Sequence, residues 1–137
     1  MTEISHVSTQ VPSVSVADPG ALGLAGFALT TFVLSLANAG IVASSAGVLS
    51  LALFYGGIAQ FAAGLWEFAN HNTFGATAFC SFGAFWMSFW YLVTSKNVVD
   101  AGSSGVGVWL LAWGIFTLYM TVAAKKTNGV VFAVFVS

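Results

Sequence analysis

The side chains of this sequence that could bind a ligand within an apolar environment are few, and most are neutral. Asn38 and Gln60 are amides within residues 20–66, a stretch that contains no Asp, Glu, Lys or Arg. Thr31 falls on the same helical face as Phe27 and Asn38, because residues four and seven positions apart share one side of an α-helix. Such groups can donate hydrogen bonds to a small anion along a pathway, or they can join neighbouring helices as packing groups. Both interpretations stay open for these residues.

Glu67 is the acid that follows this charge-free stretch, at the point where the chain is expected to leave a bilayer. A carboxylate costs about 2.5–3.5 kcal/mol at the bilayer centre and far less at the interface. We therefore interpret Glu67 first as a solvated boundary charge. The second interpretation is a proton-coupling carboxylate.

The sequence lacks the residues that several classes of function require. No Lys or Arg falls inside an apolar stretch, so an anion would have to be recognised by amides, hydroxyls and helix N-termini. His6 and His71 lie outside these stretches, and Cys80 is the only cysteine, so no nucleophilic site and no metal-binding spacing is formed. The net charge of −1 and the lack of a basic patch point to no nucleic-acid partner. We expect neither an enzyme nor a cofactor.

The elements that must position these side chains are membrane-spanning helices. The chain of 137 residues is 58% hydrophobic and 5% charged, whereas soluble domains carry about 25% charged residues. A helix needs roughly 20 apolar residues to cross the bilayer. The pattern predicts an all-α, polytopic transmembrane bundle with four complete crossings and the start of a fifth, at residues 22–43, 48–66, 74–93, 108–124 and 130–137.

The remaining segments are predicted to lie outside the membrane. Residues 1–17 are polar and lack the basic and apolar regions of a secretory signal, so we interpret them as a disordered tail before a transmembrane domain at 18–137. The Gly- and Ser-rich residues 96–107 predict a loop. Lys125 and Lys126 fall on the side of the tail and Lys96 on the other, which favours a multi-pass protein of the cell membrane with a cytoplasmic N-terminus.

Several motifs resemble those of the acetate uptake transporter family. The family's Asn-Pro-Ala-Pro-Leu-Gly-Leu signature is similar to residues 18–24, Asp18-Pro19-Gly20-Ala21-Leu22-Gly23-Leu24. Residues 54–60, 64–67, 72–79, 83–86 and 113–118 resemble further family motifs in the family's order. The resemblance covers essentially everything after the tail.

The resemblance implies a six-helix fold, assembly as a homohexamer, and a pathway for acetate or succinate in each protomer. It places Phe27 at the family's first-helix constriction, Gln60 near the pathway, and Phe82 at a constriction tyrosine. Two departures matter. Asp18 replaces the signature asparagine and adds a negative charge, and Phe82 lacks the tyrosine hydroxyl.

The end of the sequence at Ser137 leaves two hypotheses of different class. The family continues through a fifth and a sixth helix, so we expect no counterpart here of its third constriction residue, a fifth-helix leucine. The first hypothesis is a membrane transporter or channel for acetate and related small carboxylates such as succinate. The alternative is a truncated, non-transporting family member that acts only as a packing or assembly partner in the membrane.

Overall fold

The computed structural model describes residues 16–44, 46–127 and 129–136, and this part of the chain contains helices and no strand. The prediction of an all-helical bundle is confirmed. The elements are α1 (Gly20–Asn38), α2 (Ala46–Leu53), the π-helical segment η1 (Phe54–Ala59), α3 (Gln60–Ala69), α4 (Thr73–Thr94), α5 (Asn97–Ala124) and α6 (Gly129–Val136).

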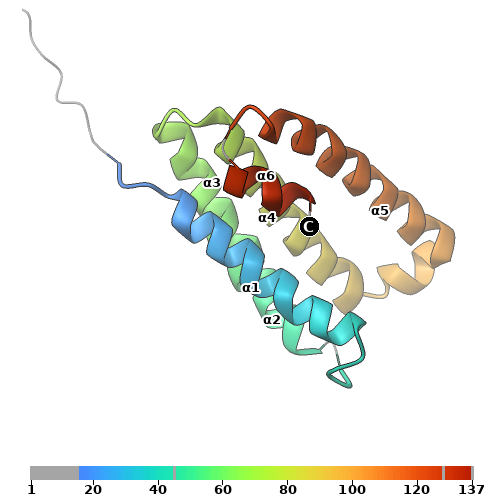
Figure 1. Ribbon diagram of the computed structural model, residues 1–137. Coiled ribbons are helices and arrows are strands. Elements are labelled where there is room, and N and C mark those ends of the chain that lie inside the picture. The colour runs from blue at the N-terminus through green and yellow to red at the C-terminus, as the bar shows by residue number, and fades with distance from the viewer. Residues whose placement is uncertain (1–15, 45, 128, 137) are drawn as a thin grey trace, which may run out of the picture.

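Four helical stretches are long and apolar enough to cross a membrane, namely Gly20–Asn38, Ala46–Ala69, Thr73–Thr94 and Asn97–Ala124. They run alternately up and down, so the start of α1, the α3–α4 turn and the α5–α6 turn lie at one end of the bundle (Figure 1). The short helix α6 then turns back and packs against α4 and α5, where Thr121 Oγ1 donates to the Phe135 carbonyl at 3.1 Å. Four crossings and the start of a fifth helix match the sequence-based prediction.

Two of the predicted boundaries are wrong, and glycine explains both. Helix α1 ends at Asn38 rather than near residue 43, because Gly40 adopts a left-handed backbone conformation (φ 72°) that stops the helix. The predicted loop at 96–107 is instead the first part of α5. Gly102 breaks that helix locally with φ 62° and ψ −179°, a conformation that glycine adopts without steric cost. Of the predicted tail, residues 1–15 lie outside the described part of the chain.

The packing of α3 against α4 depends on residues without side chains. A Cβ atom at Gly64 would lie 2.6 Å from both the backbone nitrogen and the Sγ of Cys80, and one at Gly83 would lie 2.8 Å from the Phe61 nitrogen. Small residues of this kind let membrane helices approach closely.

Replacing Gly64 by Ala should therefore force α3 and α4 apart, because the Cys80 backbone cannot move out of the way. Overpacking of this kind typically costs about 1–3 kcal/mol. The matched control is Gly107→Ala, since a Cβ at Gly107 would meet nothing within 4 Å. Thermal denaturation in detergent should show a lower midpoint for Gly64→Ala alone, and equal midpoints for the two variants would contradict this account of the packing.

The second crossing contains a feature that was not predicted. Residues Phe54–Ala59 form a π-helical turn between α2 and α3, and it includes the buried Gly56 and Gly57. Gly56 lies directly against Thr30 of α1, because a Cβ there would be 2.6 Å from the Thr30 Oγ1. π-Helical turns are often found at functional sites. This one immediately precedes Gln60 and brings the backbone of the crossing close to α1.

Candidate functional site

A cavity of about 880 Å³ lies among α1, α3, α4, α5 and α6. Its wall is mainly aliphatic and aromatic, with a small number of polar side chains. The described residues that line it include Asp18, Phe27, Thr31, Gln60, Glu67, Phe82, Trp86, Trp113, Thr117, Val131, Val134 and Phe135. An apolar cavity with a few polar groups is typical of a binding site or a pathway for a small molecule.

The structure brings four of the five predicted pathway residues together. Phe27, Thr31, Gln60 and Phe82 all line the cavity, although they come from three different crossings. Asn38 does not line it. Asn38 shares a helical face with Thr31 but lies about 10 Å further along α1, at the exposed last residue of the helix.

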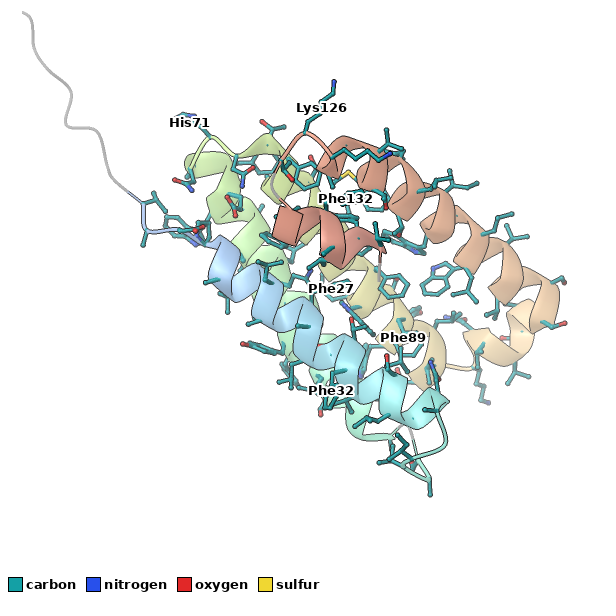
Figure 2. The ribbon with its side chains drawn as sticks, in the orientation of Figure 1. Phe27, Phe32, His71, Phe89, Lys126 and Phe132 are labelled. Carbon is teal, nitrogen blue, oxygen red and sulfur yellow. The ribbon has the colours of Figure 1, made fainter. Side chains whose placement is uncertain are left out.

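A cluster of aromatic rings is centred on Phe82, which lines the cavity. The Phe82 ring makes an edge-to-face contact with Phe27 at a centroid distance of 5.3 Å and another with Phe116 at 5.5 Å. The ring of Phe135 lies 5.7 Å from Phe82. Figure 2 shows Phe27 in the middle of the bundle, between α1 and α6.

Helix α6 therefore contributes to the wall, with Val131, Val134 and Phe135. The sequence predicted no counterpart of the family's fifth-helix leucine, and the α6 residue that contacts Phe82 is the phenylalanine Phe135. The eight residues of α6 are too few to span a bilayer. They are enough to fold back onto the aromatic face of α4, where Phe74 and Phe82 both contact Phe135.

Three hydrogen-bond donors in the wall have no partner within the described structure. Gln60 is 0% exposed and neither its amide nitrogen nor its amide oxygen is hydrogen-bonded. Thr31 Oγ1 and the indole Nε1 of Trp86 are also buried atoms without a hydrogen-bond partner, and the Trp86 residue is 2% exposed. Unsatisfied buried polar groups cost about 1–3 kcal/mol each and are rare in native proteins. All three of these side chains line the same cavity.

Trp86 was not predicted as a site residue. It was overlooked because the sequence contains many aromatic residues, and most of its tryptophans fall near helix ends, where aromatic belts form. The usable signal was its position, because Trp86 lies well inside the third crossing and one helical turn after Phe82.

The side chain of Glu67 lines the cavity and is shielded from solvent. It is 1% exposed, and its Oε2 has no hydrogen-bond partner in the described part of the chain. The interpretation of Glu67 as a solvated boundary charge is therefore wrong. The physical reason is that α3 continues to Ala69, which keeps Glu67 inside the helix and packs it against the starts of α1 and α4.

The charges of the cavity are all negative. Asp18 and Glu67 line it, and none of the described lining residues is Lys, Arg or His. All of the lysines, Lys96, Lys125 and Lys126, are exposed. No group of three or more His, Cys, Asp or Glu residues that could hold a metal ion occurs in the described part.

Four apolar helices of membrane-spanning length, which surround a partly open and mainly apolar cavity, indicate a multi-pass membrane protein. A family model described as the GPR1/FUN34/yaaH family matches residues 2–137. The chain belongs to this family, and the resemblance seen in its motifs is confirmed.

Some of the similar proteins are named as transporters or as a channel. The chain is 42% identical over 128 residues to the succinate-acetate/proton symporter SatP of Escherichia coli K12, which covers 91% of this chain and 68% of the relative. It is 44% identical to the ammonia transport outward protein 2 of Saccharomyces cerevisiae, across 90% of this chain and 48% of that protein. The solved structure of the bacterial acetate channel SatP matches with a TM-score of 0.82 and 42% identity, over 88% of this chain and 68% of that one. The chain thus spans about half the length of the fungal relatives.

Proposed function

We propose that this chain forms a transmembrane pathway for acetate and related small carboxylates such as succinate, and that the pathway runs through the cavity. The observation that carries the proposal is the set of unpartnered, buried donors on Thr31, Gln60 and Trp86 around one apolar space. A carboxylate would complete their hydrogen bonds. The relatives named for acetate and succinate support this choice of substrate.

The chemistry of the wall suits passage better than tight binding. Neutral donors hold an anion more weakly than a buried Lys or Arg would, so the ion can leave as readily as it enters. Phe27 and Phe82 form a hydrophobic constriction at which a hydrated ion loses part of its water. The pathway therefore selects small carboxylates by size and by hydrogen bonding.

The outer surface of the bundle supports a proposal for the assembly of the protein and its place in the membrane. Helix α5 exposes apolar side chains such as Val108, Leu111 and Leu118, which suit contact with lipid or with further copies of the chain. By family resemblance we propose a homohexamer in the cell membrane. Lys125 and Lys126 share an end of the bundle with the start of α1, which supports a cytoplasmic N-terminus. We assign the protein no enzymatic activity.

Glu67 is the proposed proton-coupling residue, because it is a buried carboxylate inside the pathway. Glu67→Gln keeps the shape of the side chain but has no acidic proton to exchange. Acetate uptake by this variant should lose most of its stimulation by an inward proton gradient. The matched control is Asp100→Asn, a change at an exposed acid in the first turn of α5. If Glu67→Gln responds to the gradient as the parent does, Glu67 does not couple protons.

The proposed function is tested by reconstituting the purified chain in liposomes and measuring uptake of labelled acetate. Protein-free liposomes measure the diffusion of acetic acid through the lipid. We expect saturable uptake above that background, inhibited by excess unlabelled acetate and by succinate. A monodisperse preparation that gives no flux above protein-free liposomes would contradict the proposal and favour the packing-partner hypothesis.

A further inference from the structure

Both ends of the Gln60 amide group lack a hydrogen-bond partner. The side chain is 0% exposed and lines the cavity, and neither its Nε2 nor its Oε1 is hydrogen-bonded within the described part of the chain. An amide nitrogen donates hydrogen bonds and an amide oxygen accepts them. Each polar group that is left unpaired in an apolar setting costs about 1–3 kcal/mol. A ligand that satisfies Gln60 completely must therefore accept one hydrogen bond and donate another.

Helix packing, and not hydrogen bonding, holds Gln60 in the wall. A Cβ atom at Gly26 of α1 would lie 3.3 Å from the Gln60 Cβ and 2.8 Å from the Tyr55 carbonyl oxygen, so α1 packs directly against the start of α3. The neighbouring hydroxyl of Thr30 already donates to the Gly26 carbonyl at 2.8 Å. The stem of Gln60 is thus fixed between two crossings, while its amide group has no partner on either of them.

The indole N–H of Trp86 adds a further donor in this part of the wall. A Cβ atom at Gly56 would lie 2.9 Å from the Trp86 Cδ1, the ring atom that is bonded to Nε1. Gly56 precedes Gln60 by four residues, about one helical turn. Trp86 lines the cavity, and its Nε1 is buried without a partner in the described structure. The wall therefore offers donors from two side chains and an acceptor from Gln60.

A carboxylate ion satisfies only the donors of this set, whereas a primary carboxamide satisfies the acceptor as well. Both oxygens of a carboxylate ion accept hydrogen bonds and neither donates, so the Gln60 oxygen stays unpaired. A primary carboxamide carries an N–H donor and a C=O acceptor in one plane, and it can form two parallel hydrogen bonds with the Gln60 amide. Its carbonyl oxygen has a second lone pair for the Trp86 indole. Because it is uncharged, it needs no cation, and none of the described lining residues is Lys, Arg or His.

We propose that the cavity contains a binding site for small, neutral primary carboxamides such as acetamide, and that Gln60 is its central residue. The inference goes beyond the proposed function, because it adds a class of ligand that carries no charge. Acetamide has nearly the size and shape of acetate. The mainly apolar wall, which includes Phe27 and Phe82, suits its methyl group.

Acetamide and acetone together test the site, because they have nearly the same shape but acetone lacks the N–H donor. Acetamide should raise the midpoint of thermal denaturation in detergent by a few degrees, since a ligand that binds only the folded state stabilises it. Acetone should not. The rise should be lost in Gln60→Leu and kept in Asn38→Leu, which replaces an amide that does not line the cavity. Gln60→Met should show the same loss if Gln60→Leu folds poorly.

Competition in liposomes gives a second readout, in which excess acetamide, but not acetone, should lower labelled-acetate uptake several-fold. If acetamide leaves the midpoint unchanged, or if acetone or the Gln60→Leu variant gives an equal rise, the inference is overturned and water remains the partner of Gln60. If the parent shows no acetate flux but acetamide raises its midpoint through Gln60, the proposed function fails and the carboxamide site stands. A rise in midpoint without competition keeps the site and places Gln60 outside the route of acetate.

Discussion

Gln60→Leu should lower the initial rate of labelled-acetate uptake about tenfold or more while raising the stability of the protein. The amide of Gln60 is fully buried and has no partner of its own. A hydrogen bond to a charged group contributes about 1.5–3 kcal/mol, and 1.4 kcal/mol corresponds to a factor of ten in rate. Leucine has a similar volume, so it removes the donor without opening a hole, and it also removes the cost of burying unpaired polar atoms.

The opposite signs of the two effects make this experiment specific. Uptake in liposomes gives the rate, and thermal denaturation in detergent gives the stability, each normalised to the amount of reconstituted protein. A residue that merely joins helices would lose stability when replaced by leucine. Unchanged uptake, or a fall in both quantities together, would therefore remove Gln60 from the pathway.

Phe82→Ala should widen the constriction and admit larger carboxylates. Phe82 is the ring that Phe27, Phe116 and Phe135 all contact, so its loss removes the centre of this aromatic cluster. The ratio of succinate to acetate uptake should rise several-fold, and lactate should become a substrate. Phe82→Leu fills part of the space, so it should give an intermediate ratio if Phe82→Ala folds poorly.

The matched control for this change is Phe32→Ala, which removes a phenylalanine that lies on the outside of α1 and is 60% exposed. It should leave the substrate range of the parent unchanged. If Phe82→Ala also keeps that range in a folded protein, the rings around Phe82 are ordinary helix packing and the size filter lies elsewhere.

The sequence was sufficient to predict the four crossings and much of the site. Crossings follow from the length of apolar runs, because each needs about 20 residues and the charges fall between them. Helical periodicity and family motifs together pointed to Phe27, Thr31, Gln60 and Phe82, which the fold brings to one cavity. Periodicity gives the direction of a side chain but not its depth, which is why Asn38 was included although it lies beyond the cavity.

The remaining features depend on contacts between distant segments. Glu67 is buried because α1 and α4 begin beside it. The residues near position 67 in the sequence do not predict these contacts. The same is true of α6, whose role depends on folding back against Phe82, and of the indole N–H of Trp86, whose lack of a partner is a property of the packed bundle. The local sequence at 97–107 also did not distinguish a loop from a helix, because the helical backbone there is interrupted at the single residue Gly102.

The central claim is that carboxylates pass through the cavity, and cysteine accessibility tests it most directly. Ser35 lines the cavity and is exposed, so Ser35→Cys in a Cys80→Ala background places a reactive thiol there with little change of shape. Ser50→Cys is the control, because Ser50 is exposed on α2 and is not among the residues that line the cavity. We predict that a small charged thiol reagent labels both variants, that labelling stops acetate flux only in Ser35→Cys, and that acetate slows the labelling of that variant alone. A Ser35→Cys protein that transports acetate, is labelled equally fast with and without acetate and keeps its flux afterwards would show that the carboxylate takes another route.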